Sequence, residues 1–91
     1  MRIARRFYVT GRVQGVGFRY FTRDVAVREG DTGYVRNLPD GRVEALVEGD
    51  VEAVTRVERA IRSGPGGAHV LHVDTDVLTP SGAFKSFRVT S

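Results

Sequence analysis

Residues 9–19 contain three closely spaced glycines and end on an arginine, a combination that can bind an anion. The segment reads Val-Thr-Gly-Arg-Val-Gln-Gly-Val-Gly-Phe-Arg. Gly15 and Gly17 can adopt positive φ angles, so that successive backbone N–H groups turn toward one point. A helical pattern begins directly after the loop, where the helix N-terminus adds partial positive charge. Arg19 contributes a planar guanidinium that matches phosphate oxygens, so the segment is suited to a tetrahedral anion without a metal ion.

The glycine spacing differs from that of the two common nucleotide-binding loops. The segment lacks the G-x-x-x-x-G-K-[ST] pattern of Walker-type sites. It also lacks G-x-G-x-x-G followed by an acidic ribose-binding residue in a parallel βαβ unit. From the glycines alone, two interpretations stay open: an anion-binding loop, or only a tight connection between a strand and a helix.

A second segment, residues 33–49, favours the anion-binding interpretation. Together the two segments resemble the acylphosphatase family in residue type, order and separation. The matching residues of the first segment are Val9, Gly11, Val13, Gln14, Gly15, Val16, Phe18 and Arg19. Those of the second segment are Gly33, Tyr34, Val35, Asn37, Gly41, Val43 and Gly49. The chain length fits a stand-alone member of this family, so the resemblance covers nearly the whole chain.

The resemblance implies a hydrolase that cleaves acyl phosphates to a carboxylate and inorganic phosphate. It implies that Arg19 and the preceding loop bind the substrate phosphate, and that Asn37 positions the attacking water. The loop residues are Gln14, Gly15, Val16, Gly17 and Phe18. An asparagine amide suits this role because it both donates and accepts hydrogen bonds. Arg19 and Asn37 are then the catalytic residues, no cofactor or metal is required, and inorganic phosphate or sulfate competes with the substrate.

An acyl phosphate suits such a site for a chemical reason. Its leaving group is a carboxylate, whose conjugate acid has a pKa of about 4, so it departs without being protonated. Phosphoryl transfer then needs positioning and charge stabilisation, which loop amides and one arginine supply. A phosphate monoester would need an acid for its alkoxide leaving group, and neither segment contains an obvious one.

The chain departs from the family pattern at Glu29-Gly30-Asp31-Thr32. Family members commonly carry apolar residues around a glycine at this point. We expect the departure to reduce apolar burial where the first helix ends and the second strand begins. Local packing and stability should be affected, and the proposed site should not.

Length and composition indicate one small globular domain over residues 1–91. The chain is 41% hydrophobic and 27% charged and contains no cysteine, which excludes a disulfide framework and a thiolate metal site. No apolar run is long enough for a membrane span, and the basic N-terminus lacks the apolar segment of a signal peptide. We expect a cytoplasmic monomer that acts on a small molecule.

The net charge of +3 favours anionic ligands. Acidic residues lie among the basic ones, as in Glu58-Arg59, which is typical of a solvated surface, so no specific nucleic-acid partner is expected. The alternative function is a binding module, since one small fold hosts many functions. An RNA-binding sheet needs exposed aromatic residues on its central strands, whereas Tyr8 stands alone between Arg6 and Thr10.

The spacing of apolar residues predicts seven secondary-structure elements. Strands are expected at residues 5–13, 33–37, 42–48, 69–78 and 84–90, and helices at residues 18–29 and 51–62. In the strand at 69–78, one face carries Leu71, Val73, Thr75 and Val77. This order predicts an α+β, ferredoxin-like βαββαβ sandwich with a short C-terminal strand. Two helices would cover one face of a mainly antiparallel sheet.

Other polar residues are weaker candidates for chemistry. His69 and His72 are three residues apart on a predicted strand, so they should point to opposite faces. Asp74 and Asp76 share one face of that strand, a spacing typical of solvated surface. No metal site is therefore expected.

Hydrolysis of an acyl phosphate should be insensitive to chelators, because the predicted site supplies its own positive charge. The measurement is phosphate release with and without a chelator, with a simple alkyl phosphate monoester as the poor-substrate control. Loss of most activity on chelation, with recovery on adding a divalent ion, would contradict this mechanism.

Overall fold

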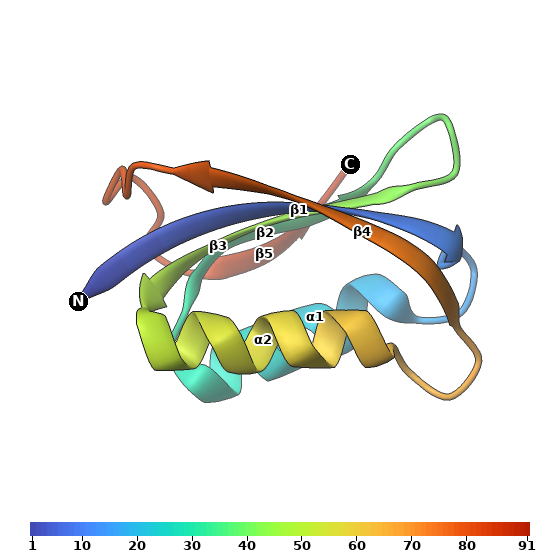
Figure 1. Ribbon diagram of the computed structural model, residues 1–91, viewed down its shortest axis with the longest axis horizontal. Coiled ribbons are helices and arrows are strands. Elements are labelled where there is room, and N and C mark those ends of the chain that lie inside the picture. Colours follow the sequence, from blue (N-terminus) through green and yellow to red (C-terminus); the bar gives the residue numbers. More distant parts are fainter.

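The computed structural model describes residues 1–91 as five strands and two helices. In chain order these are β1 (Arg2–Arg12), α1 (Phe18–Glu29), β2 (Thr32–Asn37), β3 (Val43–Asp50), α2 (Val51–Ser63), β4 (His69–Leu78) and β5 (Phe87–Thr90). Both helices lie against one face of the sheet, and the opposite face, called here the open face, has no helix over it (Figure 1). Neither helix has the length and apolar character needed to cross a membrane.

The strand order β4-β1-β3-β2-β5 confirms the predicted ferredoxin-like α+β sandwich. β1 pairs antiparallel with β3 and β4, and β2 pairs antiparallel with β3. The C-terminal strand β5 adds to the edge of β2 in the parallel sense. The sheet is thus mainly antiparallel, and β3 separates β1 from β2.

The core lies between the sheet and the helices and consists of the apolar side chains on the facing sides of these elements. The strand residues with no exposed surface are Phe7, Val9, Val35, Val43, Ala45 and Val47. The helices contribute Phe18, Val25, Val54, Val57 and Ile61 to the same cluster. Burying each large apolar side chain contributes about 1.5–3 kcal/mol, so these faces determine how the helices pack on the sheet.

The apolar face predicted for β4 is only partly buried. Val73 is buried, but Leu71 and Val77 are 70% and 74% exposed. The register shifts between Thr10 and Gly11, so that Val70 pairs with Gly11 and packs against the core, while Leu71 is the extra residue at the irregularity. β4 also diverges from α2 toward its C-terminal end, which leaves Val77 without helix cover (Figure 1).

The last strand begins later than predicted, at Phe87 and not at residue 84. The segment before it lies over the open face, where Glu48 holds it. The Glu48 carboxylate accepts a hydrogen bond from Ser81 Oγ at 2.7 Å and from the backbone N–H groups of Ser81 and Gly82 at 3.1 Å. The path of the chain at residues 81 and 82 is therefore set by hydrogen bonds to a buried carboxylate, and not by pairing with a neighbouring strand.

The departure from the family pattern has its main effect at Asp31. Its side chain is buried, and neither carboxylate oxygen has a hydrogen-bond partner. It fills the space beside Gly49, where an added Cβ would lie 1.9 Å from Asp31 Oδ1. Burial, followed by the charge of Glu29, raises the pKa of Asp31 to about 7, although Arg2 and Arg56 act in the opposite direction.

The free energy of unfolding should fall as the pH rises from about 4 to about 7. In the unfolded chain Asp31 ionises near its ordinary pKa of 3.8, whereas the folded protein keeps the proton until about pH 7. Ionisation across this interval therefore favours the unfolded state, by at most about 4 kcal/mol for three pKa units. Asp31→Asn cannot ionise and should remove most of the slope, as measured by urea denaturation across this range.

The matched control is Asp24→Asn, which changes an exposed aspartate of α1 that pairs with the adjacent Arg23. This variant should keep the wild-type slope. If Asp31→Asn also kept it, Asp31 would not be the group that titrates.

Candidate functional site

The loop of residues 13–17 connects β1 to α1 and is anchored in the core. Val13 and Phe18, on either side of the glycines, are each 1% exposed. Val16 packs against the core cluster and lies beside Gly67 of the loop that follows α2. Since these three side chains point into the core, the side of the loop that faces away from the core is formed mainly by backbone groups.

The two glycines give this loop its conformation. Gly15 and Gly17 have φ angles of 74° and 78°, in the left-handed region. A Cβ at either position would meet no atom within 4 Å, so glycine is required by conformation and not by crowding. Gly17 is also the N-cap of α1, and the first turn of the helix has neither a side-chain cap nor an acidic residue. The first N–H groups of α1 therefore have no side-chain acceptor and are available to an anion.

Arg19 adds a positive charge directly after the loop. It lies in the first turn of α1, is half-buried, and forms no ion pair, although its guanidinium lies 5.8 Å from the centre of the Tyr20 ring. Arg36, in contrast, is neutralised by Glu44 at 2.5 Å. The charge of Arg19 is thus uncompensated beside the free N–H groups of the helix, which favours an anionic ligand there.

Asn37 approaches the same side of the sheet from β2. It is the last residue of the strand and pairs with Val43 of β3. Because side chains alternate along a strand, Asn37 points to the side of the buried Val35, which α1 covers. Its Oδ1 atom is buried and accepts no hydrogen bond within the protein. This oxygen is therefore available as an acceptor.

Gln14 joins the loop to the strand that carries Asn37. Its side-chain nitrogen donates to the carbonyl oxygens of Leu38 at 2.8 Å and Arg42 at 3.0 Å, which belong to the turn directly after Asn37. Both hydrogens of this amide group are thus directed at the turn. The sequence indicated Gln14 as part of the phosphate loop but gave no sign of these partners, 24 and 28 residues away.

The turn between β2 and β3, which contains Leu38-Pro39-Asp40-Gly41, is closed by its own hydrogen bonds. The Leu38 N–H donates to Arg42 O at 2.8 Å. The Asp40 carboxylate accepts from the backbone N–H of Arg42 at 3.0 Å and from its Nε at 2.8 Å. The backbone bond, and then the side-chain bond, hold the pKa of Asp40 below its ordinary value. Gln14 therefore bonds to a turn of defined shape.

The other polar residues of β4 form contacts within that strand or with the adjacent strand β1. His72 Nε2 lies 2.8 Å from Asp74 Oδ1, and Asp76 accepts hydrogen bonds from Arg6 of β1 at 2.9 and 3.2 Å. None of these contacts involves the loop of residues 13–17. Asp74 and Asp76 thus form local surface pairs.

Sequence reasoning missed a cluster of aromatic side chains on the open face. Tyr8 stands alone in the pattern of its own strand, but Tyr34 of β2 points to the same side of the sheet. The Phe84 ring lies against the Tyr34 ring, with ring centres 6.0 Å apart. The alternation within each strand predicts both tyrosine orientations, but only the strand order shows that they share one face. The spacing of apolar residues placed Phe84 in the strand expected at residues 84–90, but Phe84 lies in the segment before β5.

The fold and the glycine-rich junction define a class, a small α+β sandwich with an uncompensated positive site at the start of its first helix. A sequence profile of the acylphosphatase family matches residues 5–89. The chain is 54% identical over 80 residues to an acylphosphatase of Chromohalobacter salexigens, covering 86% of this chain and 89% of that one. It resembles the crystal structure of acylphosphatase from Bacillus subtilis with a TM-score of 0.94 and 34% identity, covering 98% and 99% of the two chains. An acylphosphatase structure from Coxiella burnetii gives a TM-score of 0.92 at 30% identity, covering 98% and 93%. The chain belongs to the acylphosphatase family.

Replacing Gln14 with leucine tests the connection between the loop and the turn. Asn37 should lose its position while the loop amides and Arg19 remain, and a shift of about 1 Å can cost on the order of 10²-fold in rate. We expect kcat for a generic acyl phosphate to fall by about 10–10²-fold, with the inhibition constant of inorganic phosphate nearly unchanged. An equal loss in phosphate affinity would show instead that Gln14 acts on the phosphate.

Proposed function

We propose that residues 14–19 and Asn37 are the active site at which this chain hydrolyses acyl phosphates to a carboxylate and inorganic phosphate. The observation that supports this most strongly is the unpaired Arg19 beside helix N–H groups that have no side-chain acceptor. Membership in the acylphosphatase family supports the same reaction. All of the proposed groups come from one chain, so a monomer is sufficient for activity.

In the proposed mechanism the loop N–H groups and Arg19 hold the phosphoryl oxygens. These donors are fixed before the substrate arrives, because Val13 and Phe18 anchor both ends of the loop. Fixed donors stabilise the charge that develops on the phosphoryl group without reorganising during the reaction. The same groups bind the product, so inorganic phosphate or sulfate should compete with the substrate.

Asn37 orients the water that attacks phosphorus, with its buried Oδ1 accepting a hydrogen bond from that water. An oxygen–phosphorus bond forms to this water as the bond from phosphorus to the acyl oxygen breaks. The electron pair leaves with the carboxylate, which needs no proton at neutral pH. The reaction consumes one water and releases carboxylate, inorganic phosphate and one proton.

Arg19→Gln and Asn37→Ala should impair the reaction in different ways. Arg19→Gln removes a charge that contacts substrate and transition state, so affinity and kcat should both fall. Asn37→Ala removes one oriented group, which costs on the order of 10²–10³ in kcat, and phosphate binding should persist. Steady-state kinetics with an acyl phosphate give kcat, and a phosphate-dependent rise in thermal midpoint gives binding.

Arg23→Gln is the matched control, because Arg23 lies one turn further along α1 and pairs with Asp24. It should retain activity close to wild type. The assigned roles would be wrong if folded Asn37→Ala kept wild-type kcat, or if phosphate stabilised Arg19→Gln as much as wild type.

A further inference from the structure

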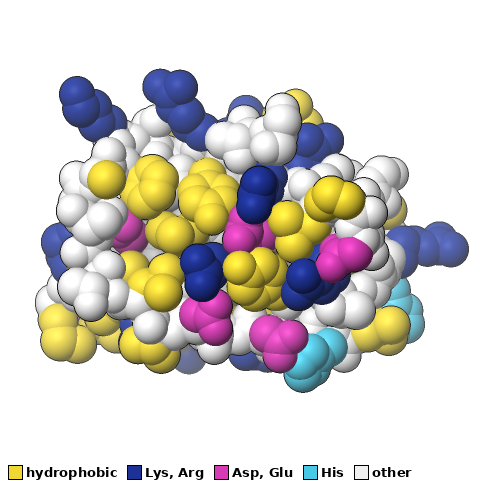
Figure 2. Space-filling view, turned by 90° about the horizontal axis from the view of Figure 1, so that it is seen from above, with side chains coloured by type: hydrophobic (Ala, Val, Ile, Leu, Met, Phe, Trp, Pro, Cys, Tyr) yellow, Lys and Arg dark blue, Asp and Glu magenta, His cyan; other side chains and the backbone are white.

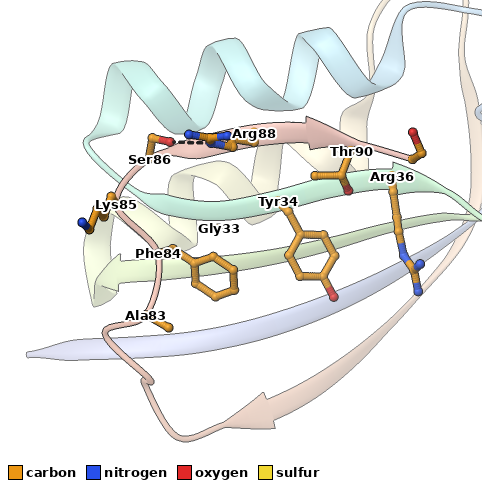
Figure 3. A pocket seen from close by; sticks show the side chains of 10 residues that line it. Gly33, Tyr34, Arg36, Ala83, Phe84, Lys85, Ser86, Arg88 and Thr90 are labelled. Atoms are coloured by element: carbon orange, nitrogen blue, oxygen red, sulfur yellow. Dashed lines mark hydrogen bonds between the residues drawn. The ribbon is translucent and has the colours of Figure 1, made fainter.

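The open face of the sheet carries a groove at the edge formed by β2 and β5. It has a volume of about 550 Å³ and lies between these strands and residues 83–86, which lead into β5 (Figure 3). This volume is within the range of small-molecule sites. Tyr34 and Arg36 point into the groove from the face opposite to Asn37. The groove is therefore separate from the proposed phosphate loop.

The wall of the groove is held in place by a buried contact. Glu48, which is 2% exposed, binds Ser81 and Gly82 and so fixes the segment that carries Phe84. The Phe84 ring lies 6.0 Å from the Tyr34 ring, at an interplanar angle of 51°. The two rings form an aromatic surface that exists before any ligand binds.

The charged side chains that line the groove are all basic. No acidic residue lines it, and neither Lys85 nor Arg88 has a carboxylate partner. Arg88 pairs in register with Tyr34, so its charge lies beside the aromatic surface, and its Nε donates to Ser86 Oγ at 3.3 Å. Arg36 is already neutralised by Glu44. Figure 2 shows hydrophobic side chains gathered on this face, with both basic and acidic side chains among them.

We propose that this groove binds a nucleoside monophosphate, with the base against Tyr34 and Phe84 and the phosphate between Lys85 and Arg88. The lining of one groove thus combines two aromatic rings with two cations, Lys85 and Arg88, that have no carboxylate partner. A planar base stacks on aromatic side chains, and a phosphate accepts charge-assisted hydrogen bonds from lysine and arginine. A nucleotide carries both groups in one molecule. This inference does not depend on the hydrolytic reaction.

The test is an NMR titration of the ¹⁵N-labelled full chain with adenosine 5′-monophosphate. Shifts of residues 14–19 are followed separately, because they report nucleotide phosphate bound at the phosphate loop. We expect saturable shifts at Tyr34, Phe84 and Lys85, and affinity at least about tenfold above that of adenosine, because a single charge-assisted contact is already worth about this factor.

Two variants locate the binding. Lys85→Gln changes an exposed residue and leaves the fold intact, and it should weaken the nucleotide but not adenosine. Phe84→Ala should weaken both. Arg59→Gln is the matched control, since it removes one exposed charge from α2 on the other face. Acyl phosphate hydrolysis should be unchanged in all three variants.

Several outcomes would overturn the proposal. These are no saturable shift, equal affinity for adenosine and its monophosphate, or an equal loss of affinity in Arg59→Gln and Lys85→Gln. Much tighter binding of a short single-stranded RNA, with shifts spread over β1 and β4, would make the whole sheet an RNA surface and would also reject the nucleotide groove. Each result leaves the hydrolytic function to be judged separately from the kinetics.

Discussion

The hydrogen bonds of Gln14 are the contact on which the geometry of the candidate site depends. The phosphate loop follows β1 and Asn37 ends β2, and β3 lies between these strands, so no backbone ladder joins them. The Gln14 amide spans the gap by binding Leu38 O and Arg42 O. Two such bonds contribute only about 0.5–1.5 kcal/mol each to stability. In the proposed mechanism their main effect is on the separation of the two motifs, because the phosphoryl group must meet both at once.

The sequence predicted what depends on local pattern and missed what depends on distant contacts. The alternation around Phe7 and Val9, and the helical spacing from Phe18, were sufficient for the elements and the core, because burial of these faces dominates the folding energy. The positions of the glycines likewise indicated the loop between β1 and α1. The partners of Gln14, the register shift that exposes Leu71 and the late start of β5 all arise from residues far apart in the chain, and no spacing rule encodes them.

The buried carboxylates of this protein show that hydrogen-bond and ion-pair partners, and not burial alone, decide whether a carboxyl group is ionised. Glu44, Glu48 and Asp31 are all at most 4% exposed. Burial opposes ionisation of Glu44, but Arg36 and the nearby tyrosine hydroxyls outweigh it and hold its pKa below the ordinary value. Ser81 and backbone N–H groups do the same for the pKa of Glu48, also against burial. Asp31 has no such donors, so burial prevails and its pKa rises. The alternation of β3 predicted neither buried glutamate, because the tyrosines and residues 81–84 that cover them come from elsewhere in the chain.

The chemistry of the leaving group explains why so few side chains are needed at the phosphate loop. In the proposed mechanism a carboxylate departs unprotonated, so no general acid is required, and backbone N–H groups with one free arginine provide the positive charge. The groups that we assign to the site all act on the phosphoryl group, and none of them is assigned to the acyl group. The side chains of the loop are consequently free for structural roles, which is how Val16 comes to pack into the core and Gln14 to hold the turn.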